Sequence, residues 1–126
     1  MSIIGIGNDL VKVSRIEKLI KRYDRRFLER IFTEAEIRYA VGKARPALHF
    51  AARFAAKEAF VKALGSGLRQ GINWPDIEII NDDFGKPLLK LHNHARSASQ
   101  KLKNPTSWLT ISHEQEFALA FVVLEI

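Results

Sequence analysis

Residues 47–64 read ALHFAARFAAKEAFVKAL, and Gly65 follows them. Alanine and leucine are strong helix formers, Pro46 suits a first helical turn, and a glycine commonly ends a helix in a left-handed conformation. The stretch therefore predicts a long helix. Its apolar content predicts that the helix lies at the centre of the fold.

Two sets of charged side chains divide this predicted helix. His49, Arg53 and Lys57 recur every fourth residue in one row, which we interpret as an ordinary solvent-exposed stripe. Glu58 and Lys62 lie elsewhere, among apolar neighbours, and charged side chains are rarely buried unless they are paired or functional. We interpret this pair as the strongest indication of chemistry in the chain. The alternative is a surface pair, worth only about 0.3–0.5 kcal/mol.

The composition indicates a globular protein that works without thiol chemistry. The 126 residues are 47% hydrophobic and 27% charged, which suits one folded domain spanning 1–126. The chain has no cysteine, which excludes disulfides, thiolate catalysis and cysteine-based zinc sites. No apolar run reaches the length of a membrane span and no signal peptide is evident, so we expect a cytoplasmic protein with no membrane insertion. The net charge of +6 favours acidic or phosphate-rich partners.

Shorter elements are predicted on both sides of the long helix. The apolar run Ile3–Gly7 predicts a strand that ends in a turn at 8–9. Two capping boxes predict helix starts, Ser14 with Glu17 and Thr33 with Glu36. The other predicted elements are helices at 26–31 and 93–102 and strands at 77–80, 88–91, 108–112 and 117–124. Adjacent late strands favour hairpins, and so an α+β fold with a largely antiparallel sheet.

Asp9 is a second candidate site residue. It follows Gly5-x-Gly7, and the two glycines allow a backbone or a phosphate to come close. The pattern lacks the third glycine of a dinucleotide fingerprint and the ending of a P-loop, so by itself it equally fits a plain turn. Asp9 and Glu58 together can share a hard cation such as magnesium, which takes few protein carboxylates and further oxygens from phosphates. Lys62, one helical turn from Glu58, can then touch the same phosphates.

Two longer motifs resemble a known family. Residues 5–10, GIGNDL, followed by Arg15-Ile16-Glu17, are similar to the amino-terminal signature of the holo-[acyl-carrier-protein] synthases, which are small bacterial 4'-phosphopantetheinyl transferases. Residues 53–65, RFAAKEAFVKALG, resemble the second signature, and residues 85–87 and 112–114 stand where the family has similar residues. The resemblance spans essentially the whole chain. It implies a 4'-phosphopantetheinyl transferase-like fold with a largely antiparallel sheet packed against a long central helix.

The resemblance also implies a reaction. Family members transfer 4'-phosphopantetheine from coenzyme A to a serine of an acidic acyl carrier protein, in support of fatty acid biosynthesis. They use magnesium and release adenosine 3',5'-bisphosphate. Small bacterial members are homotrimers with active sites at subunit interfaces, and we expect the same assembly here.

The roles that the resemblance implies fall on named residues. Asp9 and Glu58 are expected to bind the metal, while Glu58 and Lys62 are expected to be catalytic, Glu58 by helping to deprotonate the serine and Lys62 by neutralising the leaving phosphate. The expected coenzyme A contacts are Lys43, Arg45, Arg53, Lys62, Gly65, Pro87 and His113. The expected carrier-protein contacts are Arg15, Arg22 and Arg26.

Simpler interpretations stay open for several of these residues. Lys43 and Arg45 can be solvated loop charges, Arg53 can belong to the exposed stripe, and His113 can be a surface-turn histidine. Two other functions compete as well. A nucleic-acid-binding module fits the positive charge but leaves Asp9 and Glu58 unexplained, so we expect no nucleic acid partner. A different metal-dependent phosphotransferase would use the same carboxylates on another nucleotide.

Overall fold

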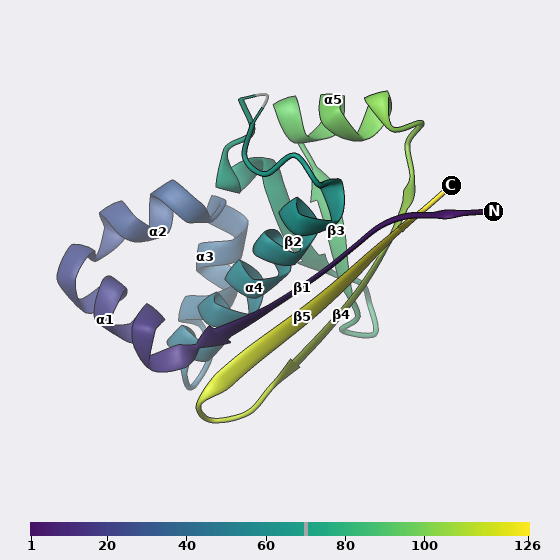
Figure 1. Ribbon diagram of the computed structural model, residues 1–126. Helices are drawn as coiled ribbons and strands as arrows, with labels where there is room; N and C mark the ends of the chain where they lie inside the picture. The colour runs from purple at the N-terminus through teal and green to yellow at the C-terminus, as the bar shows by residue number, and fades with distance from the viewer. Residues whose placement is uncertain (70) are drawn as a thin grey trace.

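The computed structural model describes residues 1–69 and 71–126. It contains five strands, five α-helices and one short 3₁₀ helix, η1, within those residues (Figure 1). In chain order they are β1 (Ile3–Lys12), α1 (Val13–Tyr23), α2 (Arg25–Ile31), α3 (Glu34–Val41), α4 (Pro46–Leu64), η1 (Trp74–Asp76), β2 (Ile77–Asn81), β3 (Pro87–Leu91), α5 (Asn93–Lys101), β4 (Thr106–His113) and β5 (Phe117–Glu125).

The strands form two antiparallel sheets around α4. β1, β5 and β4 lie in that order in the larger sheet, and β2 pairs with β3 in a hairpin. Figure 1 shows α4 lying against one face of the larger sheet, with α1, α2 and α3 grouped at one end. The predicted α+β class with a largely antiparallel sheet and a central helix is confirmed.

The boundaries of α4 follow from its sequence. Pro46 occupies the first helical position, and Gly65 ends the helix at a φ of 82°, in the left-handed region that glycine adopts without strain. The Gly65 N–H donates to the carbonyl oxygens of Val61 and Lys62, which would otherwise lack partners at the helix end. The predicted long helix is therefore confirmed, and its first residue is Pro46.

Two glycines bring β1 into direct contact with α4. A Cβ atom added to Gly5 would lie 2.0 Å from the carbonyl oxygen of Ala63, and one added to Gly7 would lie 2.0 Å from that of Ala59. No side chain fits in this space. The glycines were predicted to let either a backbone or a phosphate come close, and the structure shows the backbone of α4 there.

The first strand is longer than predicted, and the first helix begins differently. Asn8 and Asp9 were predicted as a turn, but they pair with Phe121 and Ala120 inside β1, because β5 offers partners to β1 as far as Lys12. The capping box of Ser14 and Glu17 is wrong as well. Helix α1 begins directly after β1 without a side-chain cap, and the N–H of Val13 donates to the carbonyl of Glu116. The predicted capping box of Thr33 and Glu36 is confirmed at the start of α3.

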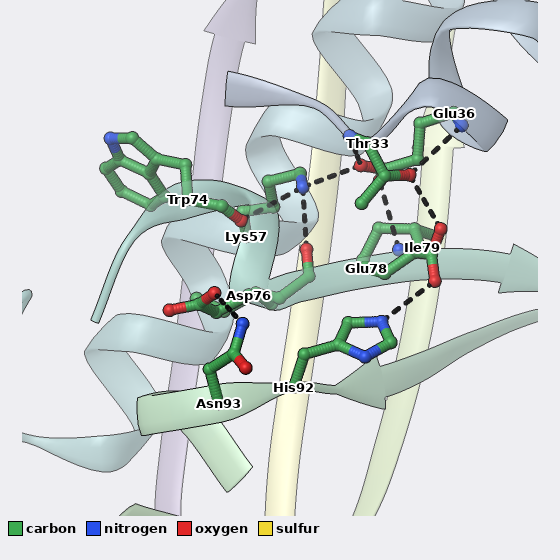
Figure 2. Close-up of polar contacts among 10 residues, drawn as sticks. Thr33, Glu36, Lys57, Trp74, Asp76, Glu78, Ile79, His92 and Asn93 are labelled. Carbon is green, nitrogen blue, oxygen red and sulfur yellow. Dashed lines mark hydrogen bonds and ion pairs between the residues drawn. The ribbon is translucent and has the colours of Figure 1, made fainter. Parts of the chain in front are cut away.

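On α4 the charged side chains that were predicted to be exposed are largely buried, and one that was predicted to lie among apolar neighbours is exposed. Arg53 is only 5% exposed and Lys57 is fully buried, so the predicted exposed stripe is wrong over these two residues. The Lys62 side chain, by contrast, is 52% exposed, and Glu58 is half-buried. The reason is that α3, η1 and β2 cover the side of α4 that carries Lys57 (Figure 2).

Lys57 is buried with a full set of acceptors. Its Nζ donates to Glu36 Oε1 at 2.8 Å, to the carbonyl of Ile77 at 2.6 Å and to that of Trp74 at 3.1 Å (Figure 2). The second oxygen of Glu36 accepts from the N–H of Ile79 at 3.0 Å. Burial lowers the pKa of Lys57, and the carboxylate of Glu36 opposes that shift. This ion pair ties α4 to α3 and to β2.

The network continues toward the surface through Glu78. Its carboxylate accepts from Thr33 Oγ1 at 2.6 Å and lies 3.0 Å from Nε2 of His92 (Figure 2). Nearby, Asp76 accepts from the side chain of Asn93 at 3.0 Å, which ties η1 to α5. The polar side chains on this side of α4 are therefore engaged with one another.

Candidate active site

Asp9, Glu58 and Lys62 gather where β1 crosses α4. Lys62 Nζ donates to Asp9 Oδ1 at 3.0 Å and to the carbonyl of Asn8 at 2.9 Å. Glu58 lies one helical turn before Lys62. Burial and then the negative charge of Asp9 raise the pKa of Glu58, while Lys62 and Arg15 act in the other direction. The structure thus brings both carboxylates and Lys62 together from segments about fifty residues apart.

The donor set at this point suits a magnesium ion that shares its ligands with a phosphate. Within residues 1–69 and 71–126 no group of three or more His, Cys, Asp or Glu side chains is placed to hold a metal. Among the described residues, Asp9 and Glu58 are the two carboxylates that come together at this point. Magnesium usually takes one or two protein carboxylates and completes its shell with water and substrate phosphate oxygens. The residues present fit that mode of binding.

Basic side chains gather on another side of α4. Arg53 Cζ lies 3.9 Å and Lys43 Nζ 4.5 Å from the ring centroid of Tyr39. The ring of His113, at the end of β4, lies 5.9 Å from that of His49. Three predicted coenzyme A contacts, Lys43, Arg53 and His113, are therefore close to one another. Sequence reasoning missed Tyr39 as a site residue and placed His49 only in the exposed stripe.

The other predicted coenzyme A contacts lie at different distances from this group. Arg45 precedes α4 and donates to the carbonyl of Gln115 and to Glu17 Oε1, the latter at 3.1 Å. Pro87 pairs with Asn81, whose Oδ1 accepts from Arg53 Nη2 at 2.7 Å. Gly65 ends α4 three residues after Lys62. Pro87 is thus near the basic group, and Gly65 is near the carboxylates.

The two groups face different sides of α4. At 3.6 residues per turn, Arg53 and Glu58 project about 140° apart around the helix axis. The contacts agree, since Lys62 reaches β1 whereas Arg53 reaches α3 and β2. A ligand that touched both groups of one chain would have to pass around α4.

Helices α1 and α2 carry the predicted carrier-protein contacts on an exposed surface. Arg15 and Arg22 are exposed on α1, and Arg26 is exposed on α2. A shallow groove beside them is lined by Leu19, Tyr23, Arg26, Phe27 and Arg30. The charge of Arg15 lowers the pKa of Glu58 against the effects of burial and Asp9, so this basic surface acts electrostatically on the carboxylates.

The larger sheet has an apolar outer face. Side chains alternate along each strand, so that Gly5, Gly7 and Asp9 face α4 while their neighbours point away. The large apolar side chains exposed on the outer face are Ile6, Leu10, Trp108, Leu119 and Phe121. Large exposed apolar surfaces are a common feature of interaction sites.

Comparisons with known proteins agree with this architecture. Residues 5–122 match the 4'-phosphopantetheinyl transferase superfamily. The chain is 46% identical over 123 residues to the holo-[acyl-carrier-protein] synthase of Geobacter sulfurreducens, covering 98% of each chain. The crystal structure of the Neisseria meningitidis synthase superposes with a TM-score of 0.92 at 36% identity, covering 99% of this chain and 100% of that one.

A further crystal structure is the Helicobacter pylori synthase in complex with coenzyme A. It has a TM-score of 0.83 at 35% identity and covers 95% of this chain and 99% of that one. Among the helices of the described residues, none has the length and apolar character to cross a membrane. By its matched residues and by these relatives, the chain belongs to the 4'-phosphopantetheinyl transferase superfamily.

Proposed function

We propose that this protein transfers the 4'-phosphopantetheine group from coenzyme A to a serine of an apo-acyl carrier protein, in support of fatty acid biosynthesis. The products are holo-acyl carrier protein and adenosine 3',5'-bisphosphate. The observation that carries the proposal is the meeting of Asp9, Glu58 and Lys62 beside a basic docking surface. Relatives named holo-[acyl-carrier-protein] synthase, one of them solved with coenzyme A, support it.

The reaction breaks one phosphorus–oxygen bond and forms another. The serine hydroxyl oxygen attacks the phosphorus that carries pantetheine, and the bond from that phosphorus to the bridging oxygen of the pyrophosphate breaks. Glu58 accepts the serine proton, and its raised pKa makes it a stronger base than an ordinary glutamate. Lys62 donates to the leaving phosphate, whose charge grows as the bond breaks.

A magnesium ion, held by Asp9 and Glu58, would supply the neutralisation of the pyrophosphate charge. Asp9 also accepts a hydrogen bond from Lys62, and so it holds the ammonium group beside the carboxylates. Of the two duties assigned to Glu58, metal binding is the primary one and proton transfer the secondary one. A magnesium titration of Glu58→Gln separates them, because a lost metal ligand is partly rescued by a higher magnesium concentration, whereas a lost base is not.

The basic residues are assigned to the two substrates. Lys43, Arg45, Arg53 and His113 bind the phosphates of coenzyme A, and the chain at Gly65 and Pro87 approaches the cofactor. The acidic carrier protein docks on Arg15, Arg22 and Arg26, where charges mainly steer association. Arg15 also lowers the pKa of Glu58, and we expect the carrier protein docked there to present its serine to the carboxylates.

We further propose a homotrimer with its active sites at the subunit interfaces. The carboxylates and the basic group of one chain face different sides of α4. One coenzyme A can therefore contact both kinds of group more easily if they come from two neighbouring copies. The exposed apolar face of the larger sheet offers the contact between copies. Sedimentation velocity of the wild type should give a trimer, and a stable, active monomer would contradict the assembly. We also propose that residues 1–126 form one domain and that the protein works in the cytoplasm.

The deciding experiment incubates the protein with coenzyme A, magnesium and apo-acyl carrier protein, and follows the mass of the carrier. We expect an increase of one phosphopantetheine on the serine. Glu58→Gln and Lys62→Ala should each lower turnover by about two orders of magnitude or more. Lys101→Ala, an exposed lysine on α5, is the matched control and should keep wild-type turnover. Near-wild-type rates for both Glu58→Gln and Lys62→Ala would contradict the proposal.

A further inference from the structure

Asn81, the last residue of β2, bonds to two separate parts of the molecule through its side-chain amide. Its Oδ1 accepts from Arg53 Nη2 on α4 at 2.7 Å, and its Nδ2 donates to the carbonyl of Gly85 at 2.9 Å. Gly85 belongs to the loop between β2 and β3, residues 82–86, which we call the β2–β3 turn. Asparagine is depleted in strands, and here the two bonds give it a task apart from strand formation, since one amide joins α4 to the turn.

Arg53 determines which way this amide faces. A guanidinium group only donates hydrogen bonds, so the amide oxygen of Asn81 has to face it, and the amide nitrogen then points to the carbonyl of Gly85. Arg53 is itself held firmly, because it is only 5% exposed and its Cζ lies 3.9 Å from the ring centroid of Tyr39. A hydrogen bond from a charged donor is also roughly twice as strong as one between neutral groups. The α4 end of the connection is therefore fixed.

The β2–β3 turn holds its own shape. Asp82 Oδ1 accepts from the N–H groups of Phe84 at 2.9 Å and of Lys86 at 2.8 Å, and the N–H of Asp82 donates to the carbonyl of Lys86 at 2.9 Å. Gly85 adopts a φ of 83°, in the left-handed region that glycine enters without strain. These local bonds set the conformation of the turn without Asn81. What Asn81 adds is the position of the turn relative to α4.

We propose that Asn81 is a positioning residue of the transfer reaction. By holding the β2–β3 turn at a fixed place against α4, it makes Arg53 and Pro87, which directly follows the turn, meet coenzyme A as one unit. The inference rests on the proposed function, which assigns both residues to coenzyme A. Substitutions separate the two bonds, since aspartate keeps the acceptor for Arg53 but lacks the donor for Gly85, and leucine lacks both. Asn81 is exposed, so neither substitution opens the core.

The first measurement compares KM for coenzyme A and for the carrier protein in wild type, Asn81→Leu and Asn81→Asp. If the turn is no longer fixed, coenzyme A binds only the fraction of molecules in which it is correctly placed, and the apparent affinity falls by that fraction. Loss of both bonds predicts a rise of about 5–30-fold in KM for coenzyme A in Asn81→Leu, with kcat and KM for the carrier protein within about twofold of wild type. Asn81→Asp should raise KM for coenzyme A by at least about threefold.

The second measurement needs no substrate. Backbone NMR order parameters of the β2–β3 turn should fall from about 0.85, typical of a rigid backbone, toward about 0.6 in both variants. The charge that aspartate adds cannot explain this fall, because the measurement contains no coenzyme A. Gln100→Leu, which removes an exposed amide on α5, is the matched control and should keep wild-type values in both measurements.

Three results would overturn the inference. A wild-type KM for coenzyme A in Asn81→Asp would show that Asn81 serves Arg53 alone, and an ordered turn in Asn81→Leu would show that other contacts hold it. Equal rises of KM for coenzyme A and for the carrier protein in Asn81→Leu would show a general loss of structure. Failure of the proposed function looks different, since wild type would then modify no carrier protein, while the order parameters would still report on the turn.

Discussion

Replacing Lys57 by methionine should strongly destabilise the fold. The substitution keeps most of the side-chain volume but leaves the carboxylate of Glu36 without its charged partner at a site where both side chains are 0% exposed. Removing one partner of a buried ion pair costs about 3–5 kcal/mol, against a total stability of about 5–15 kcal/mol for a typical domain. For a chain of this length the loss corresponds to a fall in Tm of roughly 10–20 °C.

Lys62→Met is the matched control, because it makes the same change one turn and one residue further along α4. Lys62 also pairs with a carboxylate, but its side chain is 52% exposed, so its pair is worth about 0–1 kcal/mol. Urea titration of both variants measures the difference in the free energy of unfolding. A loss below about 1 kcal/mol for Lys57→Met, or an equal loss for Lys62→Met, would refute the reasoning. Adding Glu36→Gln to Lys57→Met should recover about 1–3 kcal/mol, since it removes the uncompensated charge.

Three other predictions concern pH, docking and the metal. Burial alone would raise the pKa of Glu78, but hydrogen bonds from Thr33 and His92 outweigh burial, so the pKa is lowered in the folded protein. The ionised Glu78 therefore stabilises the fold at pH values above the pKa of the unfolded chain. This stabilisation is lost as the pH falls through the pKa of the folded protein. The free energy of unfolding should therefore fall more steeply for wild type than for Glu78→Gln between about pH 5 and pH 3, and parallel curves would contradict this. Arg22→Glu should raise KM for the carrier protein several-fold, less so at high salt, and leave KM for coenzyme A unchanged, whereas equal changes would place docking elsewhere. Asp9→Asn should raise the magnesium concentration for half-maximal rate by at least about tenfold, and an unchanged requirement would remove Asp9 from the metal site.

Local sequence signals predicted the helices and strands well where the determinants are local. Pro46 and Gly65 delimit α4, and the capping box of Thr33 and Glu36 marks the start of α3. The end of β1 was not predicted because its partner strand β5 lies more than a hundred residues away in the sequence. Pairing with β5 extends β1 beyond Gly7, so that Asp9 lies within the strand.

Burial on α4 could not be predicted from helical spacing. Spacing shows which side chains share a row, but not which other elements pack on that row. Lys57 is buried because Glu36 and two backbone carbonyls meet its ammonium group, and Glu36 is 21 residues away. Tyr39 escaped notice as a site residue because an aromatic side chain at helical spacing usually belongs to the core, and only the folded chain places Lys43 and Arg53 against its ring.

The close contact of β1 with α4 also has a consequence for the position of Asp9. Asp9 follows Gly7 by two residues and faces the same side of the strand, so the two missing Cβ atoms set how near Asp9 stands to α4 and to Glu58. A methyl group at Gly7 would push the strand outward and carry one carboxylate with it. The absence of side chains at these two positions therefore sets the separation between the carboxylates on which the proposed metal site depends.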